Sequence, residues 1–286
     1  MTDQDVVIIG LPSSGKTTFL AALWHLVTAR DLPTALRFGG LGAGDAAHLN
    51  AIARQWRNAK IQERTAVAGS RLVSINLTDE AGDIVRATFP DVPGEAYRAI
   101  WEERNCDPEI AEILKTGNVL LFIHADSIQA PQWLVDEIEL SKRLGIELAE
   151  DEVVSWHPRL APTQVQIVDL LQVLRMAPLD SGPRRLAIML SAWDKACDEG
   201  LEPDNFLKQK LPLLWQYLQQ GADGWTYQIY GLSAQGGDYD PNEEGANPAP
   251  QAEALRALDC ASSRIQLVGP LEKTHDLTEP LKWLMA

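Results

Sequence analysis

A short stretch near the amino terminus has residue types and spacing suited to holding phosphate groups. Gly10, Gly15, Lys16 and Thr17 fit the pattern G-x-x-x-x-G-K-[S/T], directly after the β-branched run at residues 6–9. In such a loop, glycines let backbone N–H groups converge on a polyphosphate, and the start of the following helix adds partial positive charge. The lysine amine reaches the β- and γ-phosphates, and the threonine hydroxyl contacts Mg²⁺. Further residues of this loop and first helical turn expected to contact the ligand are Ser13, Ser14 and Thr18.

A second candidate site follows a predicted β-hairpin. Apolar and polar residues alternate over residues 71–77, a turn follows, and a second strand continues over residues 84–89. The hairpin leads into a D-x-x-G pattern that begins at Asp91 and ends at Gly94. In this position a carboxylate can hold Mg²⁺ through a water, and a glycine N–H can sense a γ-phosphate. The antiparallel hairpin before it favours a nucleotide switch over an ordinary turn.

Two later strands end in residues that could contact a base. The apolar run at residues 185–190 leads to Asp194, and the alternating run at residues 225–230 leads to Ser233 and Ala234. Each motif is short, but all four follow a predicted strand in the order that a nucleotide switch requires. Asp194 has an alternative role as the cap of the next helix.

Taken together, these residues resemble the translation-factor and Ras-like branch of P-loop GTPases. More narrowly, residues 10–24, 161–171 and 276–284 look like the bacterial double-GTPase group. The resemblance implies an α/β fold: a Ras-like, mostly parallel mixed sheet with one antiparallel hairpin strand and helices on both faces. It also implies Mg²⁺ and GTP or GDP as ligands, with Asp194 accepting hydrogen bonds from guanine N1 and N2 and the Ser233-Ala234 turn meeting O6. A protein effector or regulator in a bacterial signalling or conflict system would be the partner.

The chain departs from that family pattern at several places. Glu95 occupies the position where small GTPases carry a glutamine that orients the attacking water. Hydrolysis is therefore expected to be slow. The catalytic candidates are Glu95 and Lys16, the lysine that reaches the β- and γ-phosphates. Ser191 and Ala192 replace the Asn and Lys that precede the base-reading aspartate. Thr65 is the nearest candidate for the switch threonine on Mg²⁺, with a plain surface threonine as the alternative. An ATP-binding P-loop ATPase and a nucleotide-binding scaffold without turnover therefore remain open.

Composition restricts the partners. The 286 residues carry 40 acidic and 25 basic side chains, a formal net charge of −15, and no Lys/Arg-rich run, which makes nucleic acid an unexpected partner. Apolar runs such as residues 119–123 are too short to span a bilayer, and the amino terminus lacks the pattern of a signal peptide. Three widely spaced cysteines fit a reducing cytoplasm.

Trp193, beside the base-reading position, either covers the base or packs in the core. The oligomeric state stays open.

The length predicts one enlarged GTPase domain over residues 1–286. Its excess lies in insertions at about 31–69 and 127–183 and in a C-terminal extension at about 236–286. Helices are expected over residues 45–63 and 132–144 within the insertions.

Overall fold

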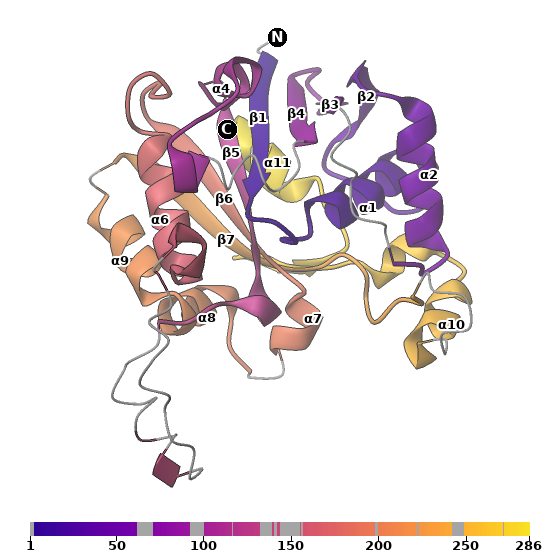
Figure 1. The fold of residues 1–286 in the computed structure, drawn as a ribbon. Helices are drawn as coiled ribbons and strands as arrows, with labels where there is room; N and C mark the ends of the chain where they lie inside the picture. The colour runs from indigo at the N-terminus through magenta and orange to yellow at the C-terminus, as the bar shows by residue number, and fades with distance from the viewer. Residues whose placement is uncertain are drawn as a thin grey trace.

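One β-sheet runs through the part of the chain that the computed structural model describes (Figure 1). That part comprises residues 3–61, 71–91, 100–115, 117–131, 139, 142–143, 155, 157–197, 200–221, 223–241, 249–270 and 272–286. The strand order is β2-β3-β4-β1-β5-β6-β7-β8-β9. The strands are β1 (Asp3–Gly10), β2 (Arg37–Ala43), β3 (Arg71–Thr78), β4 (Ile84–Asp91), β5 (Asn118–His124), β6 (Arg184–Ser191), β7 (Trp225–Ser233), β8 (Gln266–Val268) and β9 (Lys273–Thr274).

The centre of the sheet is parallel and its two sides are not. Strands β4, β1, β5, β6 and β7 run in one direction, and β3 pairs antiparallel with β4, which confirms the mixed sheet with a hairpin. The structure adds a second reversed strand, because β8 pairs antiparallel with β7. This strand has three residues, too few to give a readable alternation in the sequence. Edge strand β2 is glycine-rich, and its register with β3 shifts twice, so it also lacks a strand signal.

Helices cover both faces of the sheet (Figure 1). One face packs against α1, α2, α10 and α11, and the other against α4, α6, α8 and α9. The helices are α1 (Lys16–Ala29), α2 (Ala46–Arg57), α4 (Pro108–Lys115), α6 (Thr163–Val173), α7 (Trp193–Ala196), α8 (Pro203–Lys210), α9 (Pro212–Gln220), α10 (Pro250–Arg256) and α11 (Glu279–Met285). Short 3₁₀ turns are η1 (Ala125–Ser127), η2 (Pro158–Leu160) and η4 (Ala261–Arg264).

Strand β1 shows why the apolar runs form a doubly covered sheet. Side chains alternate across a strand, so Val6 and Ile8 join the core beneath α1 while Val7 and Ile9 join the core beneath the opposite helices. Each such side chain is essentially fully buried, which contributes about 1.5–3 kcal/mol relative to exposure. The two cores hold β1 on both faces, and its carboxyl end leads into residues 10–17, the predicted phosphate-binding loop, called the phosphate loop below.

The first insertion forms part of the same body. Helix α2 begins after Asp45, whose carboxylate accepts a hydrogen bond from the Ala47 N–H at 2.8 Å. Its buried residues, Leu49, Ile52, Ala53 and Trp56, recur at helical spacing and pack in the core shared with α1. The helix ends at Arg57, earlier than the predicted residue 63. The second predicted helix, at residues 132–144, lies for the most part outside the described residues.

The C-terminal extension is fastened to the first insertion. The Asp276 carboxylate accepts a hydrogen bond from the Ala35 N–H at 2.5 Å, and the Thr278 hydroxyl accepts one from the Leu36 N–H at 2.9 Å. Both segments therefore pack in the core on the same side of the sheet, and the single domain stays a prediction. None of the helices described here combines the length and apolar character needed to cross a membrane.

Candidate functional site

The phosphate loop connects β1 to α1 in a left-handed turn. Ser13 and Gly15 have φ of 59° and 89°, and Gly15 occupies the N-cap position of α1. Because glycine has no side chain to cap the helix, the first N–H groups of α1 remain available to an anion. Thr17 and Thr18 are half-buried on this first turn, and Ser14 is buried in the loop. The predicted residues therefore lie together at the carboxyl end of β1, around the amino end of α1.

Lys16 folds over the loop that precedes it. Its Nζ donates hydrogen bonds to the carbonyl oxygens of Gly10 at 2.8 Å and Leu11 at 2.9 Å, and to Ser14 Oγ at 3.2 Å. These three acceptors are neutral, and phosphate oxygens can compete with them for the amine, since hydrogen bonds between ionised partners are stronger. The lysine thus lies where it can exchange loop carbonyls for a polyphosphate.

Ser191, at the end of β6, joins the phosphate loop to the strand that leads to Asp194. Its side chain is 6% exposed, and Oγ lies 2.9 Å from the Ser14 carbonyl oxygen and 3.4 Å from that of Ile123. A Cβ atom on Gly15 would lie 3.1 Å from Ser191 Oγ. The sequence marks Ser191 only as a departure from the family Asn. The structure gives the serine a contact with the loop that its residue type alone does not indicate.

Asp194 lies in the first turn of the short helix α7, half-buried, with Ala192 as the N-cap residue. Ala192 therefore holds the cap position that the alternative reading gave to Asp194. The neighbouring Trp193 packs edge-on against Phe206, with ring centroids 5.2 Å apart, and its indole fills the space next to Gly231. Trp193 thus belongs to the core, and the idea that it covers a base is wrong.

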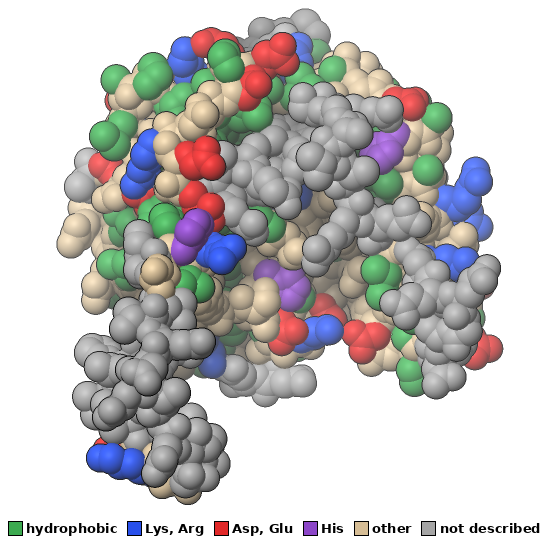
Figure 2. Space-filling view, viewed as in Figure 1, with side chains coloured by type: hydrophobic (Ala, Val, Ile, Leu, Met, Phe, Trp, Pro, Cys, Tyr) green, Lys and Arg blue, Asp and Glu red, His purple; other side chains and the backbone are tan. Residues whose placement is uncertain are grey.

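Charged and titratable groups surround Asp194. Lys195 Nζ lies 3.3 Å from Asp238 Oδ1, and this hydrogen-bonded pair raises the pKa of Lys195. Burial lowers the pKa of His124, at the end of β5 opposite Ser191, although Asp126 and Asp194 oppose that shift. A neutral imidazole near neutral pH follows. Acidic and basic side chains are interspersed over the face of the molecule that Figure 2 shows.

The predicted base-contacting turn follows β7. Ser233 is buried, and its Oγ accepts a hydrogen bond from the Gly236 N–H at 3.1 Å. The Ala234 carbonyl accepts one from Trp56 Nε1 at 2.8 Å. Because β6 and β7 are parallel neighbours, the Ser233-Ala234 turn and Asp194 come to the same edge of the sheet as the phosphate loop.

The remaining site predictions fall partly or wholly outside the described residues. Asp91 is the last residue of β4, and its backbone but not its side chain is described. In the parallel register Val7 pairs with Thr88, so three residues further on Asp91 comes level with Gly10. Thr65, Gly94 and Glu95 lie outside the described residues.

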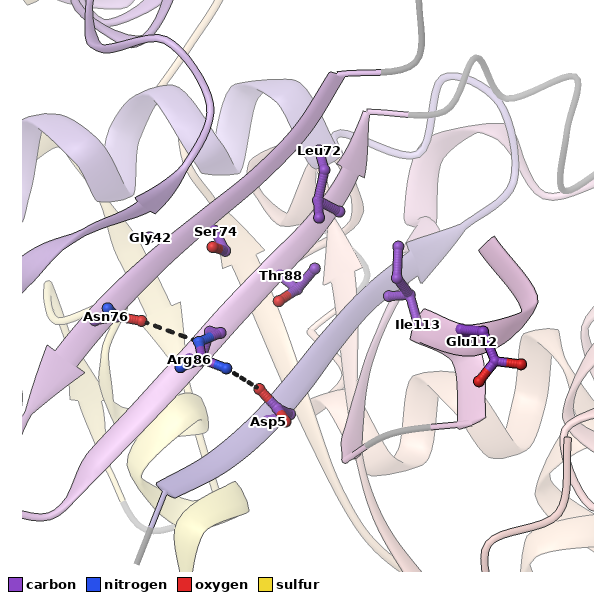
Figure 3. Close-up of a pocket in the computed structure, with 9 residues that line it drawn as sticks. All are labelled: Asp5, Gly42, Leu72, Ser74, Asn76, Arg86, Thr88, Glu112 and Ile113. Atoms are coloured by element: carbon purple, nitrogen blue, oxygen red, sulfur yellow. Dashed lines mark hydrogen bonds and ion pairs between the residues drawn. The ribbon is translucent and has the colours of Figure 1, made fainter. Parts of the chain in front are cut away.

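A separate groove lies on the sheet face opposite α1 (Figure 3). It has a volume of about 470 Å³ and crosses β3, β4 and the amino-terminal half of β1. Arg86 spans it, with Nη1 3.6 Å from Asp5 Oδ1 and Nε 3.4 Å from Asn76 Oδ1. Asp5 is five residues from Gly10, about 16 Å along an extended strand. This groove is therefore separate from the edge of the sheet that carries the phosphate loop. Its arginine, Arg86, is already paired with Asp5.

Comparison with known proteins identifies one family. The model of the Double-GTPase 1 family matches residues 7–284. No curated protein matches the sequence. Among solved structures, the chain is similar to Sup35 complexed with GMPPNP, at 15% identity and a TM-score of 0.35, covering 90% of this chain and 45% of that one. It is also similar to the S. cerevisiae Ski7 GTPase-like domain bound to GTP, at 12% identity and a TM-score of 0.38, covering 87% and 46%. The chain spans less than half the length of these structures.

Proposed function

The chain belongs to the Double-GTPase 1 family, and from that premise we propose that it binds GTP and GDP with Mg²⁺ and acts as a nucleotide-dependent switch. The observation that carries the proposal is the meeting of three motifs at one sheet edge. The phosphate loop contacts the end of β6 through Ser191, and β7, the parallel neighbour of β6, ends in the Ser233-Ala234 turn. A phosphate site and a base site joined in this way fit one nucleotide.

The phosphate end of the ligand would be held by the loop and the start of α1. The N–H groups after Gly15 would direct their partial positive charge toward the phosphates, and Lys16 would exchange its bonds to loop carbonyls for β- and γ-phosphate oxygens. Thr17 and Asp91 offer a hydroxyl and a carboxylate, the hard oxygen donors that Mg²⁺ prefers, with Thr65 as the further candidate. Mg²⁺ would supply charge neutralisation between the β- and γ-phosphates.

The base end would distinguish guanine from adenine. The Asp194 carboxylate is an acceptor that pairs with the N1–H and N2 amino donors of guanine, while adenine has an acceptor at N1 and no amino group at C2. Backbone N–H groups of the Ser233-Ala234 turn would meet the guanine O6, where adenine carries a donor. Hydrogen bonds to a charged group contribute about 1.5–3 kcal/mol each, so these contacts would favour guanine at least tenfold.

Turnover is proposed to be slow. Glu95 replaces the glutamine that orients water in small GTPases, and a carboxylate there accepts a hydrogen bond from water but also repels the γ-phosphate. Loss of the γ-phosphate would release the segments that contain Gly94 and Thr65 and so change binding to a partner protein in a bacterial signalling or conflict system. Glu95 equally supports a second candidate, a cytoplasmic nucleotide-binding scaffold without turnover. Single-turnover GTP hydrolysis, with and without candidate partners, separates the two.

Nucleotide affinities on the purified protein test the proposal. With Mg²⁺ present, titration calorimetry should give GDP and GTP tighter binding than ADP and ATP by at least about tenfold. Equal or tighter ATP binding would contradict the guanine assignment and favour an ATPase.

Lys16→Ala tests the phosphate loop separately. We expect at least a hundredfold loss of affinity for every nucleotide, equal to about 2.7 kcal/mol, because a charge-assisted phosphate contact is removed. Lys115→Ala is the matched control, since Lys115 pairs with Glu112 on α4, before the amino end of β5. Tight binding by Lys16→Ala would show that the phosphate loop is misassigned.

A further inference from the structure

The inserted helix α2 ends against the turn that follows β7. Trp56 on α2 is fully buried, and its indole Nε1 donates a hydrogen bond to the Ala234 carbonyl at 2.8 Å. Leaving the buried Ala234 carbonyl without this donor would lower the free energy of unfolding by about 1–3 kcal/mol. The hydrogen bond therefore fixes the direction of the peptide between Ala234 and Gln235.

Trp56 is itself held in place by a buried arginine. The Arg264 guanidinium lies 4.7 Å from the centroid of the Trp56 ring and donates to the Trp56 carbonyl at 3.0 Å. Arg264 is 4% exposed and also donates to the Leu255 carbonyl at 2.8 Å. The ring of His25 packs on the same indole with centroids 5.1 Å apart. With its ring and its backbone both held, the indole is a rigid donor.

The direction of the Ala234 carbonyl determines the direction of a backbone donor. A trans peptide is planar, so the Gln235 N–H points opposite to the Ala234 carbonyl, away from Trp56. The same turn is closed by the bond from the Gly236 N–H to Ser233 Oγ. Gly236 has φ of 78°, and a Cβ there would lie 2.6 Å from the Arg264 carbonyl oxygen. The turn is thus shaped by Trp56 at Ala234 and by Arg264 at Gly236.

We propose that Trp56 is a positioning residue for base recognition, holding the turn after β7 in the conformation whose N–H groups meet the guanine O6. The inference rests on the proposed function, because it concerns how the same site distinguishes guanine from adenine. It assigns to the inserted helix a role in ligand selectivity, in addition to its contribution to the core.

Trp56→Phe tests this role, because phenylalanine keeps an aromatic ring and removes the N–H donor. We expect Kd for GDP and for IDP to rise about five- to tenfold, since both bases carry O6, and Kd for ADP to stay unchanged. The control is Trp24→Phe. Trp24 is 6% exposed, and its Nε1 donates to Asn50 Oδ1 at 2.9 Å, in the packing of α1 with α2. That variant should bind all three nucleotides like the wild type.

The outcomes separate selectivity from general loosening. If Trp56→Phe binds GDP like the wild type, or weakens GDP and ADP by the same factor, the proposal is overturned. Should Trp56→Phe fail to fold, Arg264→Lys replaces it, because it removes guanidinium donors from the Trp56 carbonyl and keeps the charge. An unchanged ratio of GDP to ADP affinity in that variant overturns the proposal as well. A wild-type protein without preference for GDP over ADP contradicts the proposed function itself, and this inference with it.

Discussion

Replacing Gly15 with alanine tests how tightly the phosphate loop packs against β6. Gly15 has φ of 89°, and a Cβ placed there would lie 3.1 Å from both Cβ and Oγ of Ser191. Two costs follow, one from the left-handed backbone and one from displacing Ser191. The second cost includes the 2.9 Å hydrogen bond from Ser191 Oγ to the Ser14 carbonyl.

The two costs can be estimated separately. An L-residue in the left-handed region costs about 1–2 kcal/mol. Breaking the hydrogen bond to a buried loop carbonyl adds about 1 kcal/mol. We therefore expect Gly15→Ala to lower the free energy of unfolding by about 2–3 kcal/mol, which for a chain of this size lowers Tm by several degrees. Because the loop must shift, Kd for GDP should rise at least about tenfold, or 1.4 kcal/mol.

Gly182→Ala is the matched control. Gly182 has φ of 93°, and a Cβ there would meet nothing within 4 Å. It should cost only the backbone term of about 1–2 kcal/mol and leave nucleotide binding unchanged. Urea unfolding gives the stabilities, and calorimetry with Mg²⁺ and GDP gives the affinities.

A second comparison isolates the contact with Ser191. Ser191→Gly removes both atoms that the new methyl would meet, so Gly15→Ala should cost about 1 kcal/mol less in that background. If Gly15→Ala and Gly182→Ala destabilise the protein equally, and the cost of Gly15→Ala is the same with Ser191 and with Gly at that position, the reasoning about this contact is refuted.

Two further perturbations address the base site and His25, the α1 residue that packs on Trp56 of the inserted helix. Asp194→Ala should weaken GDP by at least about 100-fold, because two hydrogen bonds to a carboxylate are lost at about 1.5 kcal/mol or more each, while ADP affinity stays the same; calorimetry showing an unchanged GDP to ADP ratio would remove Asp194 from the base site. Burial lowers the pKa of His25 below its ordinary 6.5, with Arg57 and Arg264 adding to the shift and Asp31 opposing it. The imidazole of the unfolded chain therefore takes up a proton more readily than that of the folded chain. Neutral His25 makes its full contribution to the free energy of unfolding above about pH 6.5, and this contribution is lost as the pH falls toward the pKa of the folded state. His25→Gln should flatten this dependence in urea unfolding between about pH 7 and pH 5, and an unchanged slope would assign it to other groups.

The phosphate loop could be predicted from the sequence because its determinants are local. Glycines, a lysine and a threonine within eight residues, after a β-branched run, suffice to place the loop between β1 and α1. The parallel centre of the sheet was equally predictable, since continuous apolar runs such as the one that ends at Leu190 require cover on both faces. In each case the signal lies within a single element.

The contacts that shape the Ser233-Ala234 turn, called the base turn below, could not be predicted, because they join distant parts of the chain. Trp56 and Ala234 are 178 residues apart, and no spacing in the sequence relates them. The buried Arg264 has the sequence context of a surface residue, at the end of a 3₁₀ turn, after two serines and two residues before a glutamine. Its donors to the carbonyls of Trp56 and Leu255 become evident only when the insertion and the extension are folded together.

The same packing joins the base turn to the chain that leads toward Thr65. After α2, the Ile61 N–H donates to the Asp240 carbonyl at 2.9 Å, and the Asp240 N–H donates to the Ala59 carbonyl at 2.8 Å. These two bonds place Asp240, six residues after Ala234, beside residues 59–61, directly before the segment that contains the candidate switch threonine. A displacement of Asp240 must therefore either move residues 59–61 or break both bonds, at about 1 kcal/mol each. The inserted helix and the three residues after it thus contact the chain that follows β7 at two places, through Trp56 at Ala234 and through residues 59–61 at Asp240.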